Sequence, residues 1–308
     1  MTPFVPESRL TAIAIGVRNS AFIADEVAPR ADTGGTAEFK WTEYNPEETF
    51  TIPNTLVGRR SRTNDVEFTA TQKNDAVEDY GLSDLIPYED VMKAQNHPAF
   101  DPEGMATSKL SELVALDREK RVADRVMSAA NYANSEVITA GDKWTASTSK
   151  PIAQIVDAMN SMLVTPNIMV LGRAEAWALR QNPQIIKAYN GSLGDEGLVP
   201  LNFIRELFGL EKIVVGESKF NAARKGQPMT LTQLWSGGAS LIYQKPMAQL
   251  RDDLTFMLTA EWGGKVAARQ ELGAGEVGIR GGVRVTVGDS VKEVLISKEA
   301  GFFLQGVV

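Results

Sequence analysis

Residues 105–132 read MATSKLSELVALDREKRVADRVMSAANY and contain neither proline nor glycine. Pro98, Pro102 and Gly104 precede this stretch, so a helix can begin there and continue without a break. At 1.5 Å per residue the predicted helix is on the order of 40 Å long, well above the three turns of an average helix. Its apolar residues lie on two faces, Ala106, Leu110, Leu113 and Val114 on one, and Val122, Val126 and Ala129 on another. We therefore expect the two halves of the helix to pack against different elements.

Five consecutive charged residues, Asp117-Arg118-Glu119-Lys120-Arg121, separate the two faces. Asp117 and Arg121 have the i,i+4 spacing that favours an ion pair on an exposed helix. We therefore predict that the middle of the helix lies in solvent. Such a helix fits a spine across a flat subunit and an ordinary long helix with a solvated centre equally well.

The N-terminal residues 1–35 carry three prolines and end in Asp32-Thr33-Gly34-Gly35, a composition that opposes regular structure. Their central piece, residues 10–17 with the sequence LTAIAIGV, is apolar enough to require burial. A segment of this kind has no core of its own. We therefore predict an extended arm that lies on a neighbouring surface.

An alternating pattern follows between residues 36 and 72. Phe39, Trp41 and Tyr44 on one side, and Val66, Phe68 and Ala70 on the other, predict the two strands of a long β-hairpin. An isolated two-stranded hairpin is marginally stable in water. The segment is therefore either a flap stabilised by another molecule or an edge hairpin on the chain's own core. Its charges are Arg59, Arg60 and Arg62 near the tip and Glu43, Glu47 and Glu48 on the other strand.

The C-terminal half begins as alternating helices and strands after a Thr/Ser-rich linker. Pro151 begins a helix that Pro166 ends, and residues 168–171 form a short buried strand closed by Gly172. Further helices are expected at 174–181, at 184–189 and after Pro200, and a strand at 212–215. Strands dominate the rest, at 239–243, 255–262, 283–287, 291–296 and 302–308.

The composition excludes several kinds of catalytic and metal site and argues against an enzyme. The 308 residues include no Cys and one His, so thiol catalysis, Cys-ligated metals and His-pair metal sites are excluded. A net charge of −7 argues against a protein that coats nucleic acid. No apolar run approaches the roughly 20 residues of a membrane span, and no basic region typical of a signal peptide begins the chain. We expect no catalytic residue, cofactor or metal.

Three short features invite a chemical interpretation and do not support it. Residues 273–278 match G-x-G-x-x-G, but a second glycine pair and the alternating residues 283–287 follow where a dinucleotide site needs a helix. We predict a turn between strands instead. Ser147 and Lys150 match S-x-x-K within the Thr/Ser-rich linker, and His97 precedes Pro98 in what reads as a turn.

Two N-terminal segments, residues 10–15 (LTAIAI) and 22–29 (FIADEVAP), resemble the arm of tailed-bacteriophage major capsid proteins. The order of the later segments is similar to that family too. The resemblance covers nearly the whole chain. It implies an α+β phage major-capsid fold, shared with encapsulins, with an N-terminal arm, an extended β-hairpin loop, a peripheral domain with a long spine helix and an α/β axial domain. The segments are the hairpin 39–71, residues 79–87 (DYGLSDLIP), the long helix, residues 167–172 (NIMVLG) and residues 240–243 (SLIY).

The resemblance also implies how the chain is divided. We expect an N-terminal arm over 1–35, an extended loop over 36–75, a peripheral domain with the spine helix over 76–148, an axial domain over 149–240, and strands returning to the peripheral and axial domains over 241–308.

The implied function is that of a head-shell subunit. It would self-assemble into pentamers and hexamers of an icosahedral head around double-stranded DNA, as a virion protein assembled in the host cytoplasm. Its expected partners are copies of itself, scaffolding, portal and decoration proteins, and DNA bound without sequence specificity, with no membrane. The residues that we expect at contacts between copies are Ile13, Ile15, Phe22, Glu43, Glu47, Glu48, Arg59, Arg60, Arg62, Asp117, Arg118 and Arg121.

Two other functions stay open at this point. An encapsulin-like nanocompartment would share the fold and enclose a cargo enzyme instead of DNA. A monomeric α/β hydrolase or binding protein belongs to a different class, and the absence of a credible site is the main objection to it.

Overall fold

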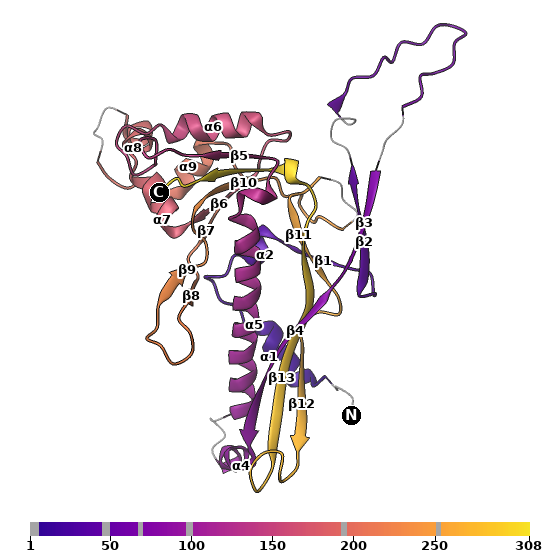
Figure 1. Cartoon of the computed structure of the whole chain (residues 1–308), viewed down its shortest axis with the longest axis vertical. Helices are drawn as coiled ribbons and strands as arrows, with labels where there is room; N and C mark the ends of the chain where they lie inside the picture. Colours follow the sequence, from indigo (N-terminus) through magenta and orange to yellow (C-terminus); the bar gives the residue numbers. More distant parts are fainter. Residues whose placement is uncertain (1–5, 45–49, 67–69, 97–100, 192–195, 251–253) are drawn as a thin grey trace.

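The computed structural model of the chain describes residues 6–44, 50–66, 70–96, 101–191, 196–250 and 254–308. Helix α5 (Pro102–Val126) runs along the long axis of the molecule, and the other elements are arranged around it (Figure 1). An α/β unit lies at one end of α5. A sheet built on a long strand, β13 (Gly282–Leu295), follows the helix toward its other end. The predicted α+β class is confirmed.

Helix α5 begins where the proline and glycine residues predict. The Asp101 side chain accepts a hydrogen bond from the backbone N–H of Gly104 at 3.0 Å and caps the helix. Pro102 occupies the first turn, where the missing N–H removes no helical bond. The helix is continuous over 25 residues, as expected from the absence of internal breakers.

Two different apolar clusters contact the two halves of α5. Ala106 and Leu110 pack with the N-terminal helix of the chain and with β13. Val122 and Val126 pack with side chains from the α/β unit. The two-faced helix is confirmed with two exceptions. Leu113, expected on the first face, is exposed, and Ala129, expected on the second, lies beyond the end of α5 at Val126.

The α/β unit follows the predicted order closely. Its sheet has the strand order β5-β14-β10-β6-β7, and the predicted helices and strands are present with small shifts at their ends. The elements are β5 (Asn134–Val137), α6 (Pro151–Ser161), β6 (Ile168–Gly172), α7 (Arg173–Gln181), α8 (Pro183–Asn190), α9 (Leu201–Leu207), β7 (Lys212–Gly216), β10 (Gly238–Ile242) and β14 (Gly301–Gln305).

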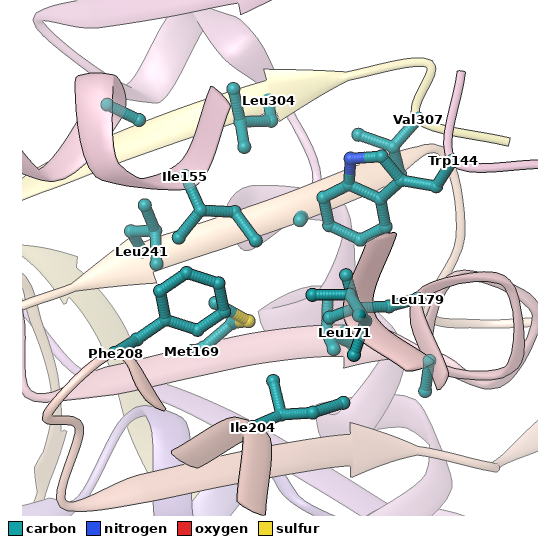
Figure 2. Packing of buried hydrophobic residues seen from close by; sticks show 14 of the residues in the cluster. Trp144, Ile155, Met169, Leu171, Leu179, Ile204, Phe208, Leu241, Leu304 and Val307 are labelled. Carbon is teal, nitrogen blue, oxygen red and sulfur yellow. The ribbon is translucent and has the colours of Figure 1, made fainter. Parts of the chain in front are cut away.

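The central strands of this sheet are buried on both faces. From β6, Met169 and Leu171 meet side chains of α6, α7 and α9 in a cluster that includes Trp144 (Figure 2). Ile168 and Val170 point to the opposite face, toward the C-terminal half of α5. Burial on both faces explains why this strand reads as a continuous apolar run.

In the second sheet β1 pairs with β11, and the long strand β13 pairs with β11 through residues 291–295 and with β12 through residues 282–288. On its opposite edge, residues 282–291 of β13 pair with β4. Two strands predicted at 283–287 and 291–296 are the single strand β13. Residues 273–278 lie in the turn between β12 and β13, as predicted. Strands β4 and β12 were not predicted. The bounds are β1 (Arg30–Asp32), β4 (Glu78–Pro87), β11 (Met257–Glu261) and β12 (Val266–Leu272).

The N-terminal residues are packed on the body of their own chain, so the prediction of an extended arm is wrong here. Residues 8–16 form helix α1 (Ser8–Gly16), which lies against α5 and β12. Leu10 and Ala14, one turn apart, are completely buried. The chain continues through α2 (Ala24–Val27) into β1, which pairs parallel with β11. The apolar stretch therefore finds its core within the same molecule.

The extended loop projects from this body (Figure 1). Strands β2 (Glu38–Tyr44) and β3 (Ala70–Ala76) form an antiparallel hairpin at its base. The predicted long hairpin is wrong in its outer part, because Val66 and the rest of residues 50–66 lie in no strand. Phe68, also expected in the second strand, lies outside the described residues. The base hairpin pairs with no other described strand.

Two short strands, one helix and two three-residue helical turns make up the rest of the elements in the described ranges. A second isolated hairpin stands beside α5 (Figure 1). Its strands are β8 (Lys219–Asn221) and β9 (Leu231–Gln233), and the remaining helices are α4 (Tyr88–Asn96), η1 (Ala129–Asn131) and η2 (Lys298–Ala300).

Gly216 gives a test of this packing. A Cβ atom at Gly216 would overlap the ring of the fully buried Trp235. We expect Gly216→Ala to lower the free energy of unfolding of the unassembled chain by about 1–3 kcal/mol, because a packed core resists an added carbon. Gly273→Ala is the matched control, since its Cβ would meet no atom within 4 Å. Equal urea midpoints for the two variants would contradict the packing.

Candidate subunit interface

The loop segment 50–66 exposes every one of its residues, including apolar ones. Ile52 is 94% exposed and Leu56 is 84% exposed. Burying such a side chain fully contributes about 1.5–3 kcal/mol, so the segment gains stability from any surface that covers it. Sequence reasoning did not single out these two residues. Their signal is an apolar pair on either side of the turn residues Pro53 and Asn54.

The three arginines of this segment are exposed, as the sequence predicted. They lie at a turn in which Ser61 N–H donates to the Gly58 carbonyl at 3.0 Å. No ion pair among the described residues involves Arg59, Arg60 or Arg62.

The glutamates expected opposite these arginines behave differently. Glu43 pairs with Lys73 across the base hairpin, so its charge is engaged within the chain. Glu47 and Glu48 lie outside the described residues. An ion-pair match between the two sides of the loop therefore stays a prediction.

A groove of about 1370 Å³ lies at the base of the extended loop. Phe39 and Trp41 line it, with ring centroids 5.7 Å apart. The indole N–H of Trp41 is buried without a hydrogen-bond partner. Ala248 and Leu250 line the same groove. Aromatic and aliphatic side chains therefore lie beside charged ones such as Arg30 and Glu38 at the base of the extended loop, and the Trp41 donor there is unpaired.

Arg118 and Glu119 in the charged middle of α5 are buried, so their predicted exposure is wrong. Glu119 accepts hydrogen bonds from the backbone N–H groups of Ile23 and Ala24 at 2.9 and 2.8 Å. It also accepts from Trp235 Nε1 at 2.7 Å and from Ser218 Oγ at 3.3 Å. These bonds tie the start of α2 and the α/β unit to the helix.

Arg118 holds the next part of the N-terminal segment. Its guanidinium donates to Asp25 Oδ1 at 2.6 Å, to the Ala28 carbonyl at 3.1 Å and to Thr259 Oγ1 at 3.0 Å. The side chain is enclosed by its own chain and offers no surface to another copy. The sequence could not indicate this, because the partners lie 90 or more residues away along the chain.

Arg121 is also directed largely inward. Its guanidinium pairs with the buried Glu293 at 3.0 Å and with Asp117, and it lies 3.6 Å from the ring centroid of Tyr80. Asp117 itself is exposed. The predicted i,i+4 pair is therefore present, but it borders a buried contact with β13.

The three apolar residues expected at contacts between copies occupy different surroundings. Ile13 is partly buried beside the cluster around α1, whereas Ile15 is 57% exposed. Phe22 is partly buried and lines a groove of about 560 Å³ with Leu113 and Leu116 of α5. The structure does not bring these residues together with the arginines of the loop segment.

The pKa values of the Glu119 and Asp25 carboxyl groups are shifted in opposite directions, one by burial and the other by neighbouring charges. Burial raises the pKa of Glu119, and its hydrogen bonds oppose this shift only in part. Desolvation also raises the pKa of Asp25, but the charges of Arg118 and Arg30 outweigh it and hold that pKa below its usual range. The middle of α5 thus contains a carboxyl group whose ionisation burial disfavours.

The described residues contain no group of three or more His, Asp or Glu side chains placed to hold a metal ion. His97 lies outside these residues. Every described helix is too short or too polar to cross a membrane.

Comparison with known proteins gives consistent matches. The profile of the family "Phage major capsid protein E" matches residues 130–217. The major capsid protein of Pseudomonas phage JBD67 is 44% identical over 308 residues, covering 99% of this chain and 98% of that protein.

Solved structures agree in fold. A phage-related protein from Bordetella bronchiseptica RB50 superposes with a TM-score of 0.75 at 18% identity, covering 99% of both chains. The capsid structure of cyanophage P-SCSP1u gives a TM-score of 0.60 at 12% identity, covering 99% of this chain and 92% of that chain.

Glu119→Gln tests the buried contact in the middle of α5. The Gln amide has the shape of the Glu119 carboxylate, but only one of its two terminal atoms accepts hydrogen bonds. Its N–H₂ group would face N–H or O–H groups that donate to the carboxylate in the wild type. We expect the variant to lose about 1–3 kcal/mol of unfolding free energy, because buried donors are left unpaired. Glu112→Gln, a change at an exposed carboxylate that accepts from Asn19, is the control and should change stability little.

The difference between wild type and Glu119→Gln should depend on pH. A carboxyl group whose pKa is raised in the folded state contributes stability that is fully present below its unfolded pKa of about 4.3. That contribution is lost as the pH rises through the folded pKa. Urea unfolding of both proteins between pH 4 and 8 should give a difference that shrinks with increasing pH. A difference that grows over this range would contradict the raised pKa of Glu119.

Proposed function

The chain belongs to the bacteriophage major capsid proteins, and from that premise we propose that it closes an icosahedral head as pentamers and hexamers around double-stranded DNA. The observation that carries the assembly proposal is the loop segment 50–66. It projects from a packed body and exposes apolar side chains that the described part of its own chain does not cover. A second copy of the chain can cover them.

Assembly proceeds through many weak contacts. Exposed ion pairs contribute about 0–1 kcal/mol each, so the arginines of the loop segment set the register between copies more than the affinity. In a closed shell each subunit makes several such contacts at once, and removing one subunit requires breaking them together. Of the residues expected at contacts between copies, we keep Ile15, Phe22, Asp117 and the three arginines as candidates.

The proposed partners follow from this role. Scaffolding, portal and decoration proteins contact the shell, which assembles in the host cytoplasm. DNA is enclosed without sequence-specific binding, since the net charge of −7 disfavours a tight grip on phosphate and lets DNA move during filling. The relatives are structural proteins, and we propose that this chain has no catalytic role either.

The two other functions weighed from the sequence are disfavoured. An identity of 44% over 99% of the chain relates it to a phage major capsid protein, so a nanocompartment shell or a monomeric hydrolase lacks comparable support. Negative-stain microscopy of particles purified from producing cells tests the proposal. Closed, DNA-filled shells are expected, and a stable monomer of 33.5 kDa under native conditions would contradict it.

Ile52→Ser with Leu56→Ser tests the apolar contact. Both side chains are exposed in the single chain, so the unfolding midpoint of the unassembled subunit should stay unchanged. The yield of shells, measured by light scattering, should fall at least about tenfold because the apolar area buried between copies is lost. Thr55→Ala in the same segment serves as the control. Normal shell yield from the double variant would remove the loop segment from the interface.

Reversal of the arginine charges tests the register. We expect Arg59→Glu, Arg60→Glu and Arg62→Glu together to give few shells or shells of abnormal size, since like charges then face each other between copies. The corresponding three Arg→Lys changes keep the charge and should assemble normally. Electron microscopy of both preparations distinguishes the outcomes, and shells of normal size and yield from the Glu variant would refute the role of the arginines.

A further inference from the structure

The hairpin β8–β9 is a second projection that the proposed function does not use. Its two strands pair with each other and with no other described strand, and residues 222–230 join them. In Figure 1 it stands away from the α/β unit beside α5. A two-stranded hairpin by itself is marginally stable in water, so its conformation needs support from elsewhere.

The base of the hairpin is fixed to the body. Phe220 packs on the cluster at the C-terminal half of α5, and Lys120 Nζ lies 5.5 Å from the centroid of its ring. Leu234 N–H donates to the Ser218 carbonyl at 3.0 Å, and Ser218 Oγ donates to Glu119. Glu119, which also binds the N-terminal segment, therefore helps to fix the orientation of the hairpin.

The tip keeps its shape without a core. Asn221 Oδ1 accepts from the backbone N–H groups of Ala223 and Thr230 at 3.1 and 2.9 Å, and Ala222 N–H donates to the Thr230 carbonyl at 2.9 Å. Nearly all residues from 221 to 232 are exposed. Among them, Met229 is 69% exposed and Leu231 is 55% exposed. A preformed shape lowers the entropy lost on docking.

The charged residues of the hairpin are all basic. Residues 218–233 contain Lys219, Arg224 and Lys225 and no acidic residue. None of the ion pairs found in the described ranges involves these three side chains. The hairpin holds three of the 32 basic residues and none of the 39 acidic residues, which leaves 29 basic and 39 acidic residues in the rest of the chain. A basic hairpin therefore projects from a chain whose other residues carry a formal charge of −10.

We propose that the hairpin β8–β9 is a second docking limb, which binds an acidic face of a neighbouring copy of this chain. This inference rests on the proposed self-assembly. Charge complementarity between the basic hairpin and the acidic remainder of the chain favours a second copy as the partner. The exposed Met229 and Leu231 beside the charges favour it over DNA, because a protein surface covers apolar side chains and a phosphate backbone does not.

A neighbouring groove extends the same surface. The groove lined by Phe22 and Leu113 also includes Glu217, Ser218 and Lys219 at the base of the hairpin. A copy seated on the hairpin would cover these apolar side chains as well. The contact would then combine an apolar centre with a charged rim, the usual anatomy of a protein interface.

The test uses the full chain with Lys219→Glu, Arg224→Glu and Lys225→Glu. We expect its shell yield, measured by light scattering and negative-stain microscopy, to fall at least about tenfold relative to wild type. The unfolding midpoint of the unassembled subunit should remain that of wild type, which excludes a folding defect. The control Lys219→Arg, Arg224→Lys and Lys225→Arg keeps the charge and should assemble normally. Met229→Ser with Leu231→Ser should lower the yield without changing any charge.

Three outcomes would overturn the proposal. Normal shells from both the Glu variant and the Ser variant would show that no copy docks on the hairpin. The proposed head-shell function would still stand in that case, because the wild-type chain forms shells. The Glu variant could instead form normal empty shells that no longer retain a 30-base-pair DNA duplex, a length of about three helical turns. That result would assign the hairpin to DNA binding. Absence of shells from wild type itself would remove the proposed function together with this one.

Discussion

The architecture depends on two charged side chains buried in the middle of one helix. Glu119 and Arg118 of α5 bind backbone and side-chain groups of the N-terminal segment, of β11 and of the loop before β10. A buried charge lowers stability unless it is paired and hydrogen-bonded. Loss of any one of these contacts would therefore leave a buried charge without a full set of partners. The result is a body in which the N-terminal residues, both sheets and α5 are joined near one point.

The two projections of this body differ from its N-terminal helix in what they bury. Helix α1 finds a core against α5 and β12, whereas the loop segment 50–66 and the hairpin β8–β9 expose apolar and basic side chains. A shell subunit needs such a division, because a rigid centre fixes the direction of its limbs and the limbs are completed by other copies. Membership of the phage major capsid proteins and the acidic body both agree with this arrangement.

Sequence reasoning predicted the α/β unit well because its signals are local. Pro151 and Gly172 mark the ends of elements, and residues 168–171 form an apolar run that only a sheet covered on both faces explains. It failed where tertiary contacts decide. The charges at 118 and 119 read as solvated because their partners are distant in sequence, and β4 (EDYGLSDLIP) lacks an alternating pattern because its side chains are mostly exposed. At the candidate interface the exposure of Arg59, Arg60 and Arg62 was predictable from their charge, but the inward orientation of Arg118 was not.

Hydrogen–deuterium exchange of unassembled and assembled subunits tests the central claim most directly, namely that the body is complete in one chain and the limbs are completed by others. The amides of residues 8–16 and 23–28 should be protected in both states. Those of residues 50–66 should be protected only in the shell, and those of residues 219–233 should exchange more slowly in the shell than in the isolated subunit. Protection of residues 50–66 in the isolated subunit, or their continued rapid exchange in the shell, would contradict the account.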